Sequence, residues 1–192
     1  MAVQSEQDIL ELIEEDIWMM EVLKAAHSLG LPDWWVCAGF VRSKIWDTLH
    51  GFKERTSLAD IDVIYFDPEN LTGKEEEHLE KKLGHLVPDL PWSVKNQARM
   101  HVVNGLPPYT SSADAISKFP ETATALGVKL DEQGGLVLIS PCGIEDVLNM
   151  EIHPTPHFLG EVRLLSIYRE RLEKKNWTAK WGKVKQGNSF LT

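Results

Sequence analysis

Apolar residues recur at helical spacing in several stretches of the chain, and each stretch predicts a helix. The first spans residues 5–30, where apolar positions follow one another every three or four residues and acidic side chains mostly fill the opposite face. Gly30 and Pro32 predict its end, because both residues commonly follow a helix. The same spacing predicts further helices over residues 40–49, 74–86, 113–118, 144–148 and 158–174.

Short runs rich in β-forming residues separate these helices and predict the strands of a sheet. The predicted strands cover residues 33–38, 60–66, 91–103, 121–130 and 136–140, and the last two flank a turn that predicts a hairpin. This order of elements predicts an α/β (α+β) fold with a mixed β-sheet, helices packed mainly on one face, a β-hairpin extension and a C-terminal helix. We expect residues 1–182 to form one domain and residues 183–192 to form a flexible tail.

Composition narrows the expected partners. The chain carries 20 basic and 29 acidic residues and a net charge of −9, which argues against bulk DNA binding but leaves room for a local basic pocket. Cys37 and Cys142 lie far apart in the sequence, as is typical of a reduced cytoplasmic protein. The sequence has no apolar run long enough to span a bilayer and no tight histidine spacing that would indicate zinc. We therefore expect a cytoplasmic monomer or weak dimer that does not bind membranes.

Two carboxylates at the head of one predicted strand are the strongest candidate for chemistry. Asp60 and Asp62 lie two residues apart, so their side chains point to the same face of the strand. Neighbouring carboxylates repel each other, and a bound Mg²⁺ or Mn²⁺ removes that conflict because hard cations favour oxygen ligands. The sequence therefore predicts a divalent-metal site here. The alternative is a solvated strand entrance where both carboxylates cap backbone groups.

Two further segments offer groups for an anion. Gly39 lies at a predicted strand-to-helix turn, where free N–H groups and the helix dipole favour an anion. Arg42, Ser43 and Lys44 follow in the first turns of that helix and add donors suited to phosphate oxygens. In the predicted strand over residues 91–103, four polar side chains share one face and would hold a phosphate or a base; they are Lys95, Gln97, Arg99 and His101. The alternative is an edge strand with one wet face.

A glycine turn followed by an Asp-x-Asp strand resembles the signature of the DNA polymerase beta-like nucleotidyltransferase superfamily. The matching positions are Ala38-Gly39-Phe40 and Ala59-Asp60-Ile61-Asp62-Val63. The chain more specifically resembles a bacterial nucleotidyltransferase-like family over most of its length. That resemblance also includes the segments 45–47, 95–101, 107–109, 119–124 and 141–143.

The resemblance implies a metal-dependent transfer of a nucleoside monophosphate from an NTP to an acceptor. Asp60 and Asp62 would bind Mg²⁺ or Mn²⁺ and act in catalysis. Gly39, with Arg42, Ser43 and Lys44, would bind the phosphates, and Lys95 and Arg99 would support the phosphates or the acceptor. The acceptor would be a small molecule, a protein or an RNA end.

Three features depart from the superfamily pattern. Phe40 stands where a small residue is usual, and the spacer from Phe40 to Asp60 is longer than usual. The third strand has no acidic residue to match the third carboxylate of active members. Asn96 would take that place as a metal ligand but not as a base. Acidic replacements from elsewhere in the chain would be Asp67, Glu145 or Asp146.

These departures leave two other hypotheses beside an active enzyme. The first is a catalytically degenerate nucleotidyltransferase fold that acts as a nucleotide- or partner-binding module. The second is a phosphatase of the haloacid-dehalogenase type, which also uses Asp-x-Asp after a strand. Ser57-Leu58-Ala59 is a poor apolar lead-in for that motif, so the phosphatase is the weakest of the three.

Overall fold

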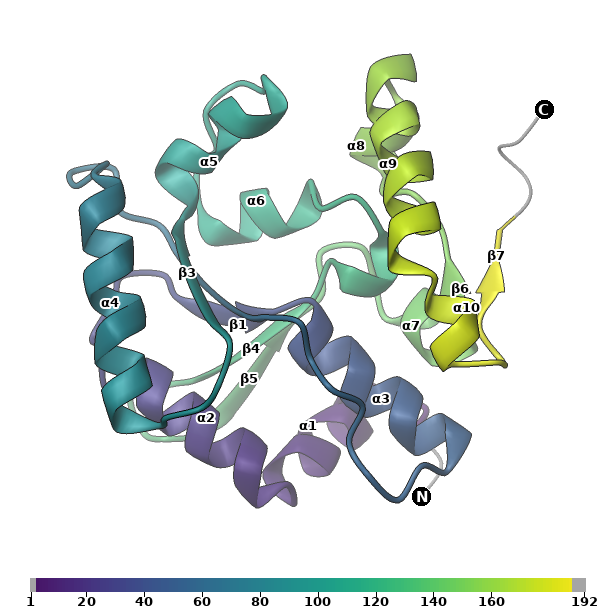
Figure 1. Ribbon diagram of the computed structural model, residues 1–192, viewed down its shortest axis with the longest axis horizontal. Coiled ribbons are helices and arrows are strands. Elements are labelled where there is room, and N and C mark those ends of the chain that lie inside the picture. Colours follow the sequence, from purple (N-terminus) through teal and green to yellow (C-terminus); the bar gives the residue numbers. More distant parts are fainter. Residues whose placement is uncertain (1–2, 188–192) are drawn as a thin grey trace.

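The fold is built around a five-stranded mixed sheet. The computed structural model describes residues 3–187, and Figure 1 shows the sheet with the helices around it. The strand order is β3-β2-β1-β4-β5, in which β2 and β3 are parallel and the other neighbours are antiparallel. The strands are β1 (Trp35–Cys37), β2 (Ile61–Tyr65), β3 (Trp92–Asn96), β4 (Gly127–Leu130) and β5 (Leu136–Ile139).

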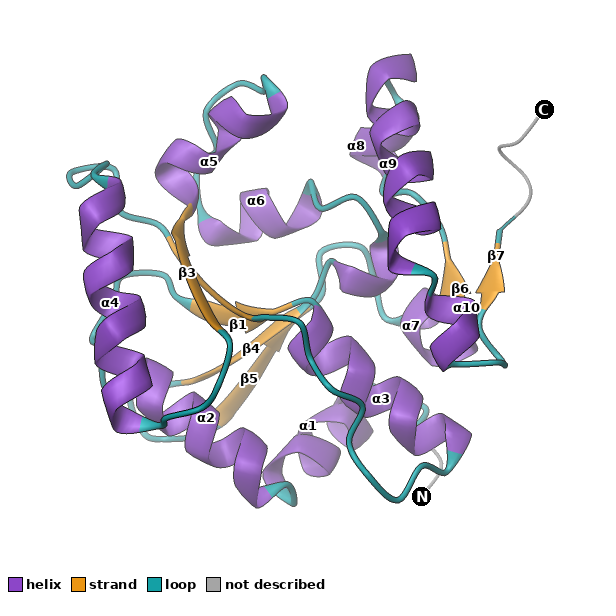
Figure 2. Cartoon of the chain, viewed as in Figure 1, coloured by secondary structure: helices purple, strands orange, loops and turns teal. Residues whose placement is uncertain are grey.

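Helices and short elements fill the segments before, between and after these strands (Figure 2). The helices are α1 (Glu6–Glu14), α2 (Ile17–His27), α3 (Gly39–His50), α4 (Gly73–Leu86), α5 (Gln97–Asn104), α6 (Ser112–Ser117), α7 (Glu145–Asn149), α8 (Pro156–Leu159), α9 (Val162–Lys175) and α10 (Trp177–Lys180). A 3₁₀ turn, η1 (Thr122–Thr124), precedes β4, and β6 (Glu151–Ile152) pairs in parallel with β7 (Lys185–Gln186). Among the described residues, no helix is long and apolar enough to cross a membrane.

The two faces of the sheet are covered unequally. Alternating side chains send four valines of β1 to β4 into the main core, where residues of α1 to α4 pack; they are Val36, Val63, Val94 and Val128. The opposite face carries Trp35, Cys37 and Ile64, which form a smaller cluster with Ile116 of α6. Asp62 shares the second face, because it lies two residues before Ile64 on β2. The predicted mixed sheet, with its main helical layer on one face and a C-terminal helix, is therefore confirmed.

Several predicted boundaries are wrong because polar side chains cap helices that the apolar pattern runs together. The first predicted helix is two helices, since the Asp16 carboxylate accepts a hydrogen bond from the Met19 amide and starts α2. The predicted strand over residues 91–103 ends at Asn96, whose side chain accepts from the Ala98 amide and starts α5. The predicted polar strand face beyond residue 96 is therefore wrong, because Arg99 and His101 lie on a helix.

The C-terminal segment is also organised differently from the prediction. Residues 158–174 belong to two helices, α8 and α9, which are separated around Gly160. The predicted tail begins at residue 183, yet Lys185 and Gln186 pair with β6. Residues 188–192 of that tail lie outside the described residues.

Buried tryptophans fix the C-terminal segment against α3. Trp181 is 1% exposed, and its indole N–H donates to Asp47 Oδ1 over 2.7 Å. The Trp46 ring packs edge-on against both Trp177 and Trp181, with centroids 5.9 and 5.2 Å away. Because α10 is held against α3 in this way, the cations of the C-terminal segment lie beside the glycine turn.

Candidate active site

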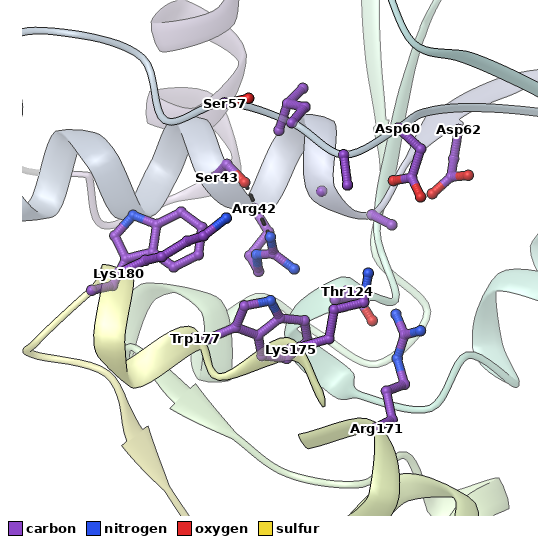
Figure 3. Close-up of a pocket in the computed structure, with 15 residues that line it drawn as sticks. Arg42, Ser43, Ser57, Asp60, Asp62, Thr124, Arg171, Lys175, Trp177 and Lys180 are labelled. Carbon is purple, nitrogen blue, oxygen red and sulfur yellow. Dashed lines mark hydrogen bonds between the residues drawn. The ribbon is translucent and has the colours of Figure 1, made fainter. Parts of the chain in front are cut away.

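Antiparallel pairing brings the glycine turn and the Asp-x-Asp stretch together. Cys37, the last residue of β1, lies opposite Asp62 near the start of β2. The chain leaves β1 directly into α3, so Gly39 and the two aspartates lie at the same edge of the sheet. Figure 3 shows the Asp60 and Asp62 side chains close together, with both carboxylates pointing into the same cavity.

The cavity holds about 260 Å³, and three parts of the chain form its walls, with Thr124 of η1 beside them. One wall is the turn and first helical residues after β1, the second is the segment leading into β2, and the third is the C-terminal segment. Its charged and hydroxyl-bearing lining residues are Arg42, Ser43, Ser57, Asp60, Asp62, Thr124, Arg171, Lys175 and Lys180.

The electrostatics of Asp62 fit a bound cation. Burial, and secondly the charge of Asp60, raise the pKa of Asp62 from 3.8 to about 6, against the hydrogen bond from Ser93 that lowers it. Two adjacent carboxylates, one of them in an unfavourable environment when charged, are oxygen donors of the kind that Mg²⁺ and Mn²⁺ prefer. Asp60 and Asp62 therefore fit a divalent metal.

The turn before α3 is strained at Ala38 rather than at the glycine. Ala38 has φ 55° and ψ −116°, a conformation that residues with a Cβ rarely adopt and that costs on the order of 1–3 kcal/mol. Strain of this kind persists where the surrounding structure enforces it, and here the Ala38 amide donates to the Leu126 carbonyl of the segment before β4. Phe40 is 1% exposed and lies 5.8 Å from the Trp18 ring, so its bulk faces the core rather than the cavity.

Arg42 is a buried cation that forms no ion pair within the part of the chain that the structure describes. Its guanidinium carbon lies 5.1, 4.4 and 5.2 Å from the ring centroids of Trp46, Trp177 and Trp181. Its side chain donates to Ser43 Oγ over 3.1 Å, while the buried Nε has no hydrogen-bond partner among the described residues. Burial lowers the pKa of Arg42 to about 10, which still leaves it charged at neutral pH. A cation held in this way suits an anionic ligand in the cavity.

The C-terminal helices supply three more cations, which the sequence interpretation missed. Arg171 and Lys175 lie four residues apart on one side of α9, and Lys180 follows on α10. Within the described part of the chain, Lys175 and Lys180 form no ion pair. Arg171 Nε lies 2.5 Å from the fully buried Glu121 carboxylate. The helical spacing and basic character of this segment were the available signals, but they gave no indication of which surface it covers.

The other predicted anion-binding residues are placed differently. Gly39, Arg42 and Ser43 line the cavity, whereas Lys44 forms a 2.7 Å ion pair with Asp16. Lys95 lines a neighbouring cavity and pairs with Glu80 at 3.0 Å.

Asn96 and Arg99 are engaged in structural contacts away from the cavity. The Asn96 side chain binds the backbone of Asp67 and Asn70. Arg99 forms a two-point ion pair with Glu76, at 2.8 and 2.6 Å. The Asn96 side chain thus holds the end of β3 against the loop after β2, and the Arg99 side chain holds α5 against α4.

No acidic residue of β3 faces the two aspartates. Ser93 lies opposite Asp62 in the parallel register and hydrogen-bonds to its carboxylate. The acidic replacements named from the sequence, Asp67, Glu145 and Asp146, do not line the cavity. Asp146 instead lies with Glu151 and His153, whose potential ligand atoms are all within 4.8 Å of one another in a separate group.

Comparisons with known proteins identify the family and the fold of the chain. The chain matches the nucleotidyltransferase family over residues 24–186. It is 42% identical to a solved protein whose structure is described as revealing a CCA-adding enzyme head domain, with a TM-score of 0.87 over 96% of this chain and 97% of that one. No curated protein matches the chain.

Larger solved enzymes share the fold at lower identity. A CCA-adding enzyme in its apo form I is 15% identical with a TM-score of 0.56, over 94% of this chain and 43% of that one. A tRNA-processing enzyme in its apo form 2 is 16% identical with a TM-score of 0.51, over 88% of this chain and 45% of that one. The chain thus spans less than half the length of these two enzymes. By its family match and its fold, the chain belongs to the nucleotidyltransferase family.

Proposed function

We propose that the protein transfers a nucleoside monophosphate from an NTP to an acceptor hydroxyl in a reaction that depends on Mg²⁺ or Mn²⁺. One observation carries the proposal: a single cavity combines two adjacent carboxylates with three cations, Arg42, Lys175 and Lys180, that form no ion pair with the described residues. The carboxylates suit a metal. The cations suit the negative charge that would remain on the phosphates after a bound metal had neutralised part of it. Family membership supports the same class of reaction.

Each wall of the cavity would have one task. Asp60 and Asp62 would hold the metal, which when bound offsets the charge of the triphosphate and orients it for displacement. The backbone at Gly39 and the side chains of Arg42 and Ser43 would bind the terminal phosphates. Lys175 and Lys180 would complete the phosphate site from the C-terminal segment. Mutual positioning and charge, rather than a covalent intermediate, would then lower the barrier.

The reaction would exchange one phosphorus–oxygen bond for another. The acceptor oxygen would form a bond to the α-phosphorus, and the bond from that phosphorus to the oxygen bridging to the β-phosphate would break. Pyrophosphate would leave into the cationic part of the cavity. The hydroxyl proton would pass to water, because β3 presents Ser93 rather than a carboxylate beside Asp62.

A binding module that keeps the fold without the chemistry is the second candidate. The replacement of the third carboxylate by Ser93 favours it, because active members of the superfamily that the chain resembles carry an acid there. Such a module would bind an NTP in the same cavity and release no pyrophosphate. If the protein is an enzyme, three classes of acceptor are candidates: a small molecule, a protein or an RNA end. The RNA end is suggested by similar proteins described as CCA-adding and tRNA-processing enzymes.

Calorimetric titration of the four NTPs in Mg²⁺ or Mn²⁺ tests the metal and nucleotide site. We expect at least one NTP to bind only with metal, and Asp60→Asn to weaken that binding about 100-fold, because a carboxylate ligand is lost. Asp67→Asn is the matched control, since Asp67 does not line the cavity, and its affinity should stay within twofold of wild type.

Unchanged affinity in Asp60→Asn would contradict the proposed site. A pyrophosphate-release assay over a panel of acceptors then separates the two candidates. Metal-dependent NTP binding without release by any acceptor class would favour the binding module.

A further inference from the structure

A second cavity, of about 230 Å³, meets the first one at Asp62. The two share Ala38, Asp62, Thr124 and Arg171. From these shared residues the first cavity extends toward α3, α9 and α10, whereas the second extends toward β3, α5 and α6. The two cavities therefore run to different sides of Asp62.

The lining of the second cavity is mainly apolar and partly aromatic. Six residues from β2, α5 and the segments around α6 supply the apolar walls: Ile64, Met100, Val103, Tyr109, Phe119 and Pro120. The volume is below the range of about 300–1,000 Å³ that is typical of sites for drug-sized ligands. The cavity thus suits a single ring with a short substituent.

The cations of this second cavity already have carboxylate partners. Lys95 pairs with Glu80 at 3.0 Å, and Lys118 pairs with Asp114 at 2.6 Å. The shared Arg171 pairs with Glu121. By contrast, Arg42, Lys175 and Lys180 of the first cavity pair with none of the described carboxylates. A phosphate in the second cavity would have to approach paired carboxylates, so this side favours an uncharged group.

We propose that the second cavity binds the acceptor, and that the acceptor is a small uncharged alcohol that carries a ring. The inference rests on the proposed function: in nucleotidyl transfer the attacking and leaving oxygens lie roughly in line. Pyrophosphate leaves toward the unpaired cations, so the acceptor approaches the α-phosphorus from the other side of Asp62. Its oxygen bonds to that phosphorus, pyrophosphate departs, and its proton passes to water. The ring then lies between α5 and α6.

Methyl NMR of the full chain tests this assignment with 2-phenylethanol as the neutral probe and 2-phenylethyl phosphate as its charged match. Both are titrated with and without Mg²⁺ and the NTP that binds. We expect the alcohol to shift the methyl signals of Ile64 and Met100, and to bind at least tenfold more tightly than the phosphate.

Two neighbouring valines of α5 provide matched variants. Val103 lines the cavity and Val102 does not, and both are largely exposed, at 72% and 69%, so an aspartate at either position should leave the fold intact. Val103→Asp should weaken alcohol binding at least fivefold, and Val102→Asp less than twofold. Affinity for the metal–NTP complex should change less than twofold in both variants.

Four results would overturn the assignment. Tighter binding of the phosphate, or displacement of the alcohol by a single-stranded RNA dodecamer, would identify a charged acceptor. Equal loss of NTP and alcohol affinity in Val103→Asp would assign the cavity to the nucleoside of the NTP. Absence of NTP binding in the wild-type protein would overturn the proposed function as well. The titration of the alcohol without nucleotide separates that case, because it measures alcohol binding independently of the NTP.

Discussion

Asp62→Asn is expected to abolish nucleotidyl transfer and at the same time to stabilise the metal-free protein. Activity should fall on the order of 1,000-fold, equal to about 4 kcal/mol of transition-state stabilisation, because the proposed metal ligand is lost. The free energy of unfolding in EDTA at pH 7.5 should rise by about 2 kcal/mol. A gain in stability with a loss of activity is the signature of a carboxylate kept charged for function.

The stability gain follows from the pKa of Asp62. Burial and Asp60 raise that pKa from 3.8 to about 6 in the folded protein, so the folded state binds a proton more tightly than the unfolded state. The contribution of Asp62 to stability therefore falls as pH rises from about 4 to 6, and its cost reaches about 3 kcal/mol above pH 6. Asparagine carries no charge, so the Asp62→Asn variant avoids most of this cost in folding free energy.

The pH dependence provides the control for Asp62→Asn. Urea unfolding at pH 4 compares two proteins that are both uncharged at this position, so their stabilities should agree closely. An equal gain at pH 4 and pH 7.5 would show that the effect does not come from the charge. A variant that retained wild-type turnover would contradict the assignment of Asp62 as a metal ligand.

Arg42→Met is expected to weaken NTP binding about 100-fold while leaving the free energy of unfolding within about 1 kcal/mol of wild type. Arg42 is 7% exposed and forms no ion pair with the described residues, so the cost of burying its charge exceeds what the nearby carboxylates of Glu121 and Asp60 offset. Methionine removes that cost, and it also loses the contacts of the guanidinium with three tryptophan rings. These two changes oppose each other in stability, whereas only the loss of the cation affects the phosphate site.

Arg42→Lys separates charge from geometry at the same position. Lysine keeps the charge but lacks the planar donor fork, so it should recover part of the lost affinity. Calorimetry with the metal–NTP complex measures both variants. A large loss of stability in Arg42→Met with unchanged NTP affinity would show that the tryptophan-lined arginine is purely structural.

The local part of the site could be predicted from the sequence, because the signals are local. Asp60 and Asp62 are two residues apart on a strand, and Gly39 follows another strand directly, so each pattern is visible without knowledge of the fold. Their proximity depends on the antiparallel pairing of Cys37 with Asp62, which neither local pattern reveals. The mixed sheet was predictable because each strand and helix also has a local sequence pattern.

The rest of the candidate site depends on contacts between segments that are distant in the sequence. Trp181 reaches Asp47 across 134 positions of sequence, and that contact places Lys180 beside Arg42. Periodicity cannot reveal such a contact, so the cations of α9 and α10 were missed. Asn96 was misinterpreted because its capping bond starts a helix inside a run of strand-forming residues. The capping hydrogen bond of the Asn96 side chain thus outweighs the strand propensity of the neighbouring residues.

Paramagnetic broadening by Mn²⁺ tests the central claim most directly, because it locates the metal without requiring a known acceptor. Substoichiometric Mn²⁺ is added to the isotopically labelled protein in the presence of the NTP that binds. Amide signals of Ile61, Asp62 and Ser93 should disappear first, while those of residues 146–153 should persist. Broadening centred on Asp146, Glu151 and His153, with Asp62 unaffected, would contradict the proposed metal site.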